Sequence, residues 1–323
     1  MKVYSQPECQ ITLTISIVGV FYYYYFMNVI MVAEDINKDG SFKQTRGELM
    51  CMVSSLAFIK HFYPHFKTTF FVDRFTKEYY KSFGILDLFD EVNDTLLDQK
   101  VLIDKNIFWA AGKIMAQRET NGPTLTLDLD FWLFSDIEKL GVFDSDVSCL
   151  WVEEINDEYY QRPEVALRNS GLDWNYGWGN HALNVSFLYL KDNDFKNEYC
   201  DTAINYMKSK YNKIPKGLPF KEKTKHILFA EQYMLNELVK LKDKRVKVLV
   251  DDFYNVEDLN YVSSVGVGLS NCGYYLYHMG NHKEQFVVET EFAKKMIDSF
   301  YLTTVSQTNN EKFINVIETL YNN

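Results

Sequence analysis

The sequence predicts an α/β fold in which a mixed, mostly parallel sheet is flanked by helices. Short apolar runs of strand length alternate with longer segments whose apolar residues recur at helical spacing. Hydrophobic residues make up 47% of the 323 residues and charged residues 24%, which is typical of a packed globular protein. Strands that alternate with helices along a chain form largely parallel sheets with helices on their faces.

The alternation is clearest in the first 130 residues. Strands are expected at 1–5, 68–73, within 91–101 and at 123–130, and helices at 47–62, 77–83 and 107–118. The polar segment 35–46 is expected to be a loop. Pro64 ends the first helix, because proline cannot continue a helical hydrogen-bond ladder.

The second half is less regular. Strands are expected at 182–190, 246–250 and 274–280, and helices at 199–208, 226–241, 292–301 and 312–321. In open α/β sheets, ligands bind beyond the carboxyl ends of the strands. The end of the strand at 123–130 is therefore the first place to look for a site.

Residues 11–33 form a run of 23 residues without a charge, long enough to span a bilayer. Its first half alternates apolar and polar residues with the period of a strand. Its four consecutive tyrosines at 22–25 would lie near the bilayer centre, whereas tyrosine prefers the interface. Two interpretations stay open: strands that are buried or covered by a second copy of the chain, and a membrane-associated segment.

Charge and cysteine content narrow the class of protein. The net charge of −10 argues against a nucleic-acid partner, which requires a basic face. The five cysteines are scattered and form no C-x-x-C pair, so neither a zinc site nor a disulfide framework is indicated. A cytoplasmic location is expected, with membrane association through 11–33 as the alternative.

Two carboxylates close the strand expected at 123–130. Asp128 and Asp130 are separated by one residue, and residues i and i+2 of a strand share a face. Adjacent carboxylates repel each other unless a cation lies between them, and Mg²⁺ and Mn²⁺ prefer oxygen ligands. The pair indicates a divalent cation site. Two acids at the start of a solvated turn are the other interpretation.

A second cluster lies at residues 277–283. His278 and His282 offer imidazole ligands, Gly280 permits close backbone approach, and Lys283 could contact a phosphate. A histidine after an aromatic strand can also be purely structural.

Together these clusters resemble the motifs of nucleotide-sugar glycosyltransferases of the GT-A (Rossmann-like) fold, and most closely the glycogenin and lipopolysaccharide galactosyltransferase-like group. The resemblance implies that Asp128, Asp130 and His278 hold Mn²⁺ (or Mg²⁺) against a nucleoside diphosphate. It also implies that Lys283 and the backbone at Gly280 contact the diphosphate. The late motif of that group is H-x-x-G-x-x-K, and this chain has one residue fewer between His278 and Gly280.

Three further segments fit the same group. The A-L-N-V-S segment around Asn184 resembles its F-N-x-G strand, which lies under the acceptor sugar. The E-Q-Y-M-L-N segment resembles its D/E-Q-x-x-L-N helix, which implies that Glu231 and Gln232 face the reaction centre. A W-x-x-x-K pattern, shared with uncharacterised bacterial proteins, places Trp109 and Lys113 towards the donor. As an alternative without a functional role, Trp109 and Lys113 could equally be core and surface residues.

The resemblance implies one GT-A domain over 1–323, in which 1–130 bind the nucleotide sugar and 131–323 bind the acceptor and form C-terminal helices. The implied activity is metal-dependent hexosyl transfer to an acceptor hydroxyl, in glycan or surface-polysaccharide synthesis. Glu231 would act as the base of an inverting enzyme, and Gln232 as a positioned polar group in a retaining one. The alternatives are a metal-dependent phosphohydrolase and a GT-A-like binding module without catalysis.

Overall fold

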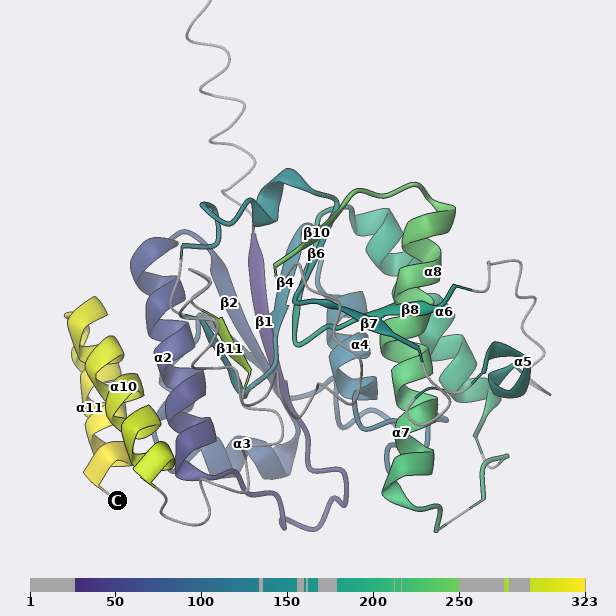
Figure 1. The fold of residues 1–323 in the computed structure, drawn as a ribbon. Helices are drawn as coiled ribbons and strands as arrows, with labels where there is room; N and C mark the ends of the chain where they lie inside the picture. Colours follow the sequence, from purple (N-terminus) through teal and green to yellow (C-terminus); the bar gives the residue numbers. More distant parts are fainter. Residues whose placement is uncertain are drawn as a thin grey trace, which may run out of the picture.

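A seven-stranded sheet forms the centre of the part of the chain that the structure describes (Figure 1). The structure is a computed structural model and describes residues 27–133, 136–155, 160, 162–167, 179–211, 213–215, 217–249, 276–278 and 291–322. The strand order is β10-β6-β9-β4-β1-β2-β3. The strands are β1 (Asn28–Ala33), β2 (Lys67–Val72), β3 (Glu91–Asn93), β4 (Thr124–Leu127), β6 (Val147–Cys149), β9 (Phe187–Leu190) and β10 (Val246–Val248).

The sheet is mixed and mostly parallel, as the sequence predicted. β1 runs parallel to β2 and β4, β2 to β3, and β6 to β10, whereas β9 runs antiparallel to both of its neighbours. Two small antiparallel sheets lie beside it. They pair β5 (Phe131–Leu133) with β11 (Leu276–His278), and β7 (Val152–Glu154) with β8 (His181–Leu183). The arrangement is consistent with the expected Rossmann-like GT-A fold.

Helices cover both faces of the sheet (Figure 1). One face carries α2 (Arg46–Phe62), α10 (Glu291–Gln307) and α11 (Glu311–Asn322). The other carries α4 (Ala111–Glu119), α6 (Asn193–Ser209), α7 (Phe220–Leu228) and α8 (Met234–Leu241). The remaining α-helices are α3 (Arg74–Lys81) and α5 (Pro163–Ala166), and Ile85–Leu88 and Val142–Asp144 form 3₁₀ turns.

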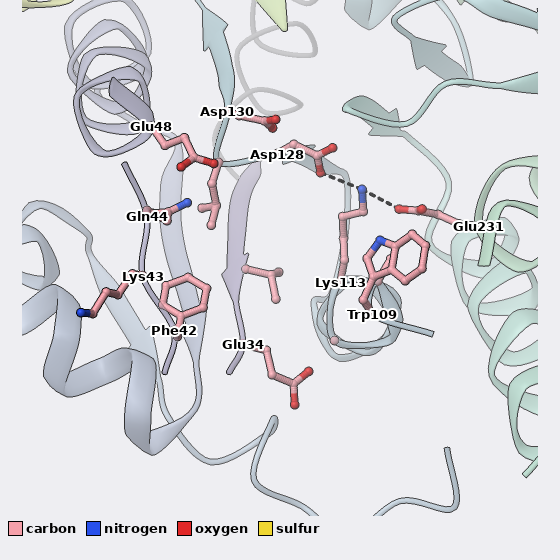
Figure 2. A pocket seen from close by; sticks show the side chains of 14 residues that line it. Glu34, Phe42, Lys43, Gln44, Glu48, Trp109, Lys113, Asp128, Asp130 and Glu231 are labelled. Atoms are coloured by element: carbon pink, nitrogen blue, oxygen red, sulfur yellow. Dashed lines mark hydrogen bonds and ion pairs between the residues drawn. The ribbon is translucent and has the colours of Figure 1, made fainter. Parts of the chain in front are cut away.

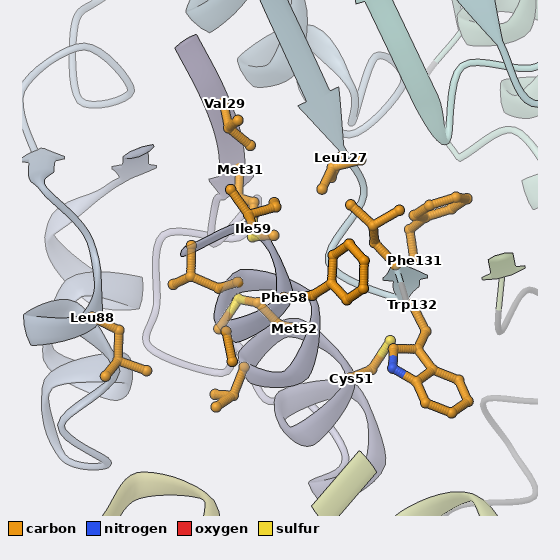
Figure 3. Packing of buried hydrophobic residues seen from close by; sticks show 14 of the residues in the cluster. Val29, Met31, Cys51, Met52, Phe58, Ile59, Leu88, Leu127, Phe131 and Trp132 are labelled. Carbon is orange, nitrogen blue, oxygen red and sulfur yellow. The ribbon is translucent and has the colours of Figure 1, made fainter. Parts of the chain in front are cut away.

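Alternate residues of each strand pack into different cores, as the pleat requires. In β9, Phe187 and Tyr189 join the core under α2, and Leu188 and Leu190 join the core under α6. The first of these cores, shown in Figure 3, places Phe58 of α2 among side chains of the sheet and of β5.

Three of the expected elements differ from the structure in ways that affect the site. The helix expected at 107–118 begins at Ala111, so Trp109 lies in the turn before it. The strand expected at 123–130 ends at Leu127, so the two acids lie in the turn that follows, and the argument that they share a strand face is wrong. The strand expected at 182–190 is two strands, β8 and β9, in different sheets.

The long uncharged run ends inside the protein. Its last six residues form β1, which is hydrogen-bonded to strands on both sides and is largely buried. The 23-residue run is therefore not a continuous bilayer span. Residues 11–26 and the strand expected at 1–5 lie outside the described residues. Among the described helices, none has the length and apolar character needed to cross a membrane.

Lys196 of α6 fixes the chain where it enters β4. Its buried ammonium group donates hydrogen bonds to the carbonyls of Thr120 and Gly122 (2.8 Å to Gly122) and to Thr124 Oγ1 (2.9 Å). In the same turn, the Gly122 amide donates to Asn193 Oδ1 at 2.9 Å. Because β4 leads directly to the two acids, α6 helps to position them.

We expect Lys196→Met to lower the free energy of unfolding by about 3 kcal/mol, because one buried and two part-buried acceptors lose their donor. Denaturant unfolding would measure it. Lys208→Met on the exposed side of the same helix is the matched control and should change stability by about 0.5 kcal/mol at most. Equal stability of the two variants would contradict the positioning role of Lys196.

Candidate active site

A cavity of about 440 Å³ lies beyond the carboxyl ends of β1 and β4 (Figure 2). Five acidic residues line it, namely Glu34, Glu48, Asp128, Asp130 and Glu231. Lys43 and Lys113 are the lysines in its lining. Five carboxylates against two ammonium groups leave a formal charge of −3, so an anionic ligand would enter this cavity only together with a cation.

Lys113 of α4 lies between two of these carboxylates (Figure 2). Its Nζ is 2.7 Å from Asp128 Oδ1 and 2.5 Å from Glu231 Oε1. The side chains of Lys113 and Glu231 are 12% and 8% exposed, and that of Asp128 is 28% exposed. Burial lowers the pKa of Lys113, but the two carboxylates outweigh that effect and raise it above its ordinary value. The lysine therefore stays charged and links residues that are more than 100 positions apart.

Glu231 is presented by a π-helical turn. Phe229–Tyr233 form this turn between α7 and α8, and both Glu231 and Gln232 are buried in it. The Tyr199 hydroxyl donates a hydrogen bond to the Glu231 carbonyl at 2.8 Å. Such turns are frequent at functional sites, because the extra residue re-aims the neighbouring side chains. Burial raises the pKa of Glu231, and the nearby Lys113 opposes that rise.

Gln232 and Asn184 meet in a separate buried network around Glu153. Glu153 Oε1 accepts hydrogen bonds from Asn184 Nδ2 and from the Trp151 indole N–H, both at 2.9 Å. The Tyr160 hydroxyl contacts Glu153 Oε2 and lies 2.6 Å from Gln232 Oε1. The network adjoins the cavity, since the charge of Glu153 contributes to the raised pKa of Glu231. Asn184 and Gln232 therefore lie behind the cavity wall and not in its lining.

The turn that carries the two acids is held from two sides. The Asp128 amide donates to the Ser186 carbonyl at 2.9 Å, and the Phe131 amide donates to the Asp128 carbonyl at 3.1 Å. On the other side, Ser55 Oγ of α2 donates to the Phe131 carbonyl at 2.7 Å and accepts from the Leu133 amide at 2.8 Å. These contacts fix the path of the chain after β4 and therefore the positions of Asp128 and Asp130.

The strand that contains His278 lies beside this turn. β11 pairs antiparallel with β5, and His278 lies opposite Phe131, the residue after Asp130. The backbone thus brings together two motifs that are about 150 residues apart in the sequence. The His278 side chain, together with Gly280, His282 and Lys283, lies outside the described residues.

Asp128 and Asp130 are the described side chains that the sequence assigned to the cation. Among the described side chains, no three His, Cys, Asp or Glu residues are grouped closely enough to hold a metal ion. Mg²⁺, however, is commonly held by one or two carboxylates together with substrate phosphates. The Lys113 contact uses Oδ1 of Asp128, and Asp130 lines the same cavity. The donor chemistry therefore fits Mg²⁺ or Mn²⁺, and the metal stays a prediction.

Trp109 lines the cavity, and its ring stacks on Phe220 with centroids 5.3 Å apart.

Three acidic residues of this region were not expected from the sequence, namely Glu34, Glu48 and Glu153. Glu34 directly follows β1, so the rule that led to Asp128 also applies to it. Glu48 is the capping-box residue of α2, and no local pattern distinguishes Glu153.

Most of the chain matches one sequence family. Residues 32–303 match the profile of DUF6734, described as a family of unknown function. The chain belongs to this family. No curated protein matches the sequence.

Solved structures with distant similarity include two transferases. The glycosyltransferase GlyE of Streptococcus pneumoniae TIGR4 in its apo form is 11% identical, with a TM-score of 0.37, over 86% of this chain and 63% of that one. This chain therefore spans less than two thirds of that enzyme. Mouse xyloside xylosyltransferase 1, also in apo form, is 10% identical, with a TM-score of 0.37, over 80% of this chain and 99% of that one.

A third similar structure is the nucleoside-diphosphate-sugar pyrophosphorylase of Vibrio cholerae RC9. It is 11% identical, with a TM-score of 0.35, over 72% of this chain and 93% of that one. Similarity at this level supports no inference about activity.

We expect Lys113→Met to lower the free energy of unfolding by about 3 kcal/mol at neutral pH, because Glu231 loses its buried cation. The pKa of Glu231 would rise further above its unfolded value. Protonation then relieves the loss at low pH, and the deficit grows as pH rises through that pKa. Denaturant unfolding at pH 5 and pH 8 would measure the two deficits.

Lys139→Met is the matched control, because Lys139 is 82% exposed and its partner Asp136 lies outside the cavity. Its effect should be about 0.5 kcal/mol or less at both pH values. A Lys113→Met deficit that is the same at pH 5 and pH 8 would contradict the pairing with Glu231.

Proposed function

We propose that this protein is a metal-dependent glycosyltransferase that moves a sugar from a nucleoside-diphosphate sugar to an acceptor hydroxyl. One observation carries the proposal: Lys113, Asp128 and Glu231 form a buried ion cluster in an acidic cavity at the carboxyl ends of the strands. The cluster combines groups expected for a cation-bound diphosphate with a carboxylate that can take a proton. The resemblance of the sequence motifs to GT-A enzymes supports the same activity.

Asp128 and Asp130 are the proposed ligands of Mn²⁺ or Mg²⁺, with His278 as a third. A bound divalent cation would supply Lewis-acid stabilisation of the leaving diphosphate. The protein's part is to hold the two carboxylates at the cavity wall and to keep Lys113 charged beside them. Lys283 is proposed to contact the diphosphate directly.

Glu231 is the proposed base towards the acceptor hydroxyl. It lines the cavity, whereas Gln232 is engaged by Tyr160 in the network behind it. Burial raises the pKa of Glu231 and Lys113 opposes that rise, so the carboxylate is suited to accept a proton. This arrangement favours an inverting reaction over a retaining one. Glu153 is proposed to position Asn184 and Gln232 and thereby to shape the acceptor side.

Finer parts of the proposal rest on the motif resemblance alone. The nearest group would be the glycogenin and lipopolysaccharide galactosyltransferase-like enzymes, the transferred group a hexose, and the product a glycan or surface polysaccharide. Residues 1–130 would bind the donor and 131–323 the acceptor.

We expect UDP or GDP to raise the melting temperature of the wild-type protein in the presence of Mn²⁺ and not in EDTA. Asp130→Ala should lose this metal-dependent shift and still unfold cooperatively, because the residue lies in the turn after β4. The exposed acid Asp144, replaced in Asp144→Ala, is the control and should keep the shift. Absence of a shift with any nucleoside diphosphate would overturn the proposed activity.

We expect Glu231→Gln to lower kcat by about 10²- to 10⁴-fold, the usual contribution of a general base, with little change in nucleotide affinity. Because burial raises the pKa of Glu231, the acid limb of the wild-type pH profile should lie above the ordinary glutamate pKa. The variant should lack that limb. Nucleotide-sugar turnover from pH 4 to pH 9 would measure both, and an unchanged profile would remove Glu231 from the role of base.

A further inference from the structure

We propose that a second cavity binds the remote part of an extended glycan acceptor, so that the sugar is added to an oligosaccharide chain. This cavity has a volume of about 540 Å³. Three parts of the chain line it: the loop after β1, the segment 103–107 before α4, and residues between 211 and the first turn of α7. The inference rests on the proposed function and adds a binding site to it.

The two cavities share a wall. Glu34 lines the first cavity, and its carboxylate pairs with Lys38 at 2.9 Å and with Lys105. Both lysines line the second cavity, so one ion cluster separates the two. The segment 103–107, which lines the second cavity, also leads to Trp109 in the lining of the first. One extended ligand can therefore occupy both cavities.

An aromatic pair lies at the boundary between the cavities. The Phe220 ring stacks on Trp109 with ring planes 16° apart, and Phe220 is 73% exposed. Figure 2 shows Trp109 on the side of the first cavity that carries Lys113 and Glu231. Phe220 begins α7, and Lys223, three residues later on the same helix face, lines the second cavity. The exposed ring therefore leads from the proposed base towards the second cavity.

The second cavity offers hydrogen-bonding groups that the protein itself does not use. The side chains of Asn106, Tyr211 and Lys223 line it and have no hydrogen-bond or ion-pair partner among the described residues. An amide, a phenol and an ammonium group together donate and accept hydrogen bonds, as the hydroxyl groups of a sugar also do. Sugars also have an apolar C–H face, which packs on the electron-rich face of an aromatic ring such as Tyr211. The lining thus matches both surfaces of a sugar.

Charge distinguishes the second cavity from a phosphate site. Three lysines against Asp104 give its lining a formal charge of +2. Lys38 and Lys105, however, already pair with the carboxylate of Glu34. Lys223 is thus the lysine left for a ligand among the described lining residues. One ammonium group does not neutralise a diphosphate, which carries several negative charges, whereas a neutral or singly charged sugar needs no more.

The test measures how affinity depends on the length of an oligosaccharide. The probes are chains of one to six units in three series: β1,4-linked glucose, β1,4-linked N-acetylglucosamine and α1,4-linked galacturonate. Each is titrated into the protein with Mn²⁺ and with UDP or GDP, and ligand-observed NMR gives the Kd. We expect at least one series to bind roughly tenfold more tightly or better as its chain lengthens, because ring contacts and hydrogen bonds are added.

Two variants and a control assign this gain to the second cavity. Phe220→Ala and Tyr211→Ala each remove an exposed ring, so they should fold and lose most of the gain with chain length. Their affinity for the nucleoside diphosphate should match that of wild type. Phe62→Ala is the matched control, because Phe62 is also exposed and stacks on a buried ring, that of Phe58, but lines neither cavity. It should keep the full gain.

The outcomes separate this inference from the proposed function. If no series gains affinity with length, or if the gain survives both substitutions, the second site is overturned while the proposed function stands. Weaker nucleotide binding by Phe220→Ala or Tyr211→Ala would also overturn it, because the rings would then belong to the donor site. If no nucleoside diphosphate binds the wild type but long oligosaccharides bind as expected, the proposed function fails and the second cavity stands as a glycan site.

Discussion

The pairing of Lys113 with Asp128 and Glu231 is the interaction on which the site depends. Two consecutive elements, α4 and the turn after β4, and a segment more than 100 residues later each contribute a charged group to one partly buried position. Two carboxylates at this position would repel each other without the lysine, and burial alone would favour the protonated form of Glu231. The lysine lies on α4, which precedes β4, and Glu231 lies in the π-helical turn between α7 and α8. The ion cluster thus couples the sheet edge to that turn.

The other contacts keep this cluster in place. Ser55 of α2 ties down β5 immediately after the acids, and Lys196 of α6 ties down the entry to β4. The acids therefore sit in a turn that is anchored before and after by helices on opposite faces of the sheet. The π-helical turn positions the other partner of the cluster. It directs Glu231 towards Lys113 and Gln232 towards Tyr160.

The sequence indicated the class of the sheet and half of the cavity, although no strand was expected at β6. The end-of-strand rule led to Asp128 and Asp130 and would have led to Glu34, because all three follow apolar strands. Sequence could not show that the acids lie in a turn, since that depends on the Ser186 carbonyl of a distant segment. Glu153 was also beyond reach. Its role comes from Asn184, Trp151 and Gln232, which meet only in the folded chain.

The charged residues that line the cavity limit which ligands can bind in it. Its carboxylates exclude a bare diphosphate, so the proposed phosphate-binding end at Asp128 and Asp130 requires a cation to arrive with the ligand. Glu34 adds a further carboxylate to the lining of the cavity, where Lys38 and Lys105 pair with it. Under the proposed function, the diphosphate would lie with a cation at Asp128 and Asp130, near Lys113. Glu231 pairs with the same lysine, so the proposed base would lie beside the proposed metal-bound diphosphate.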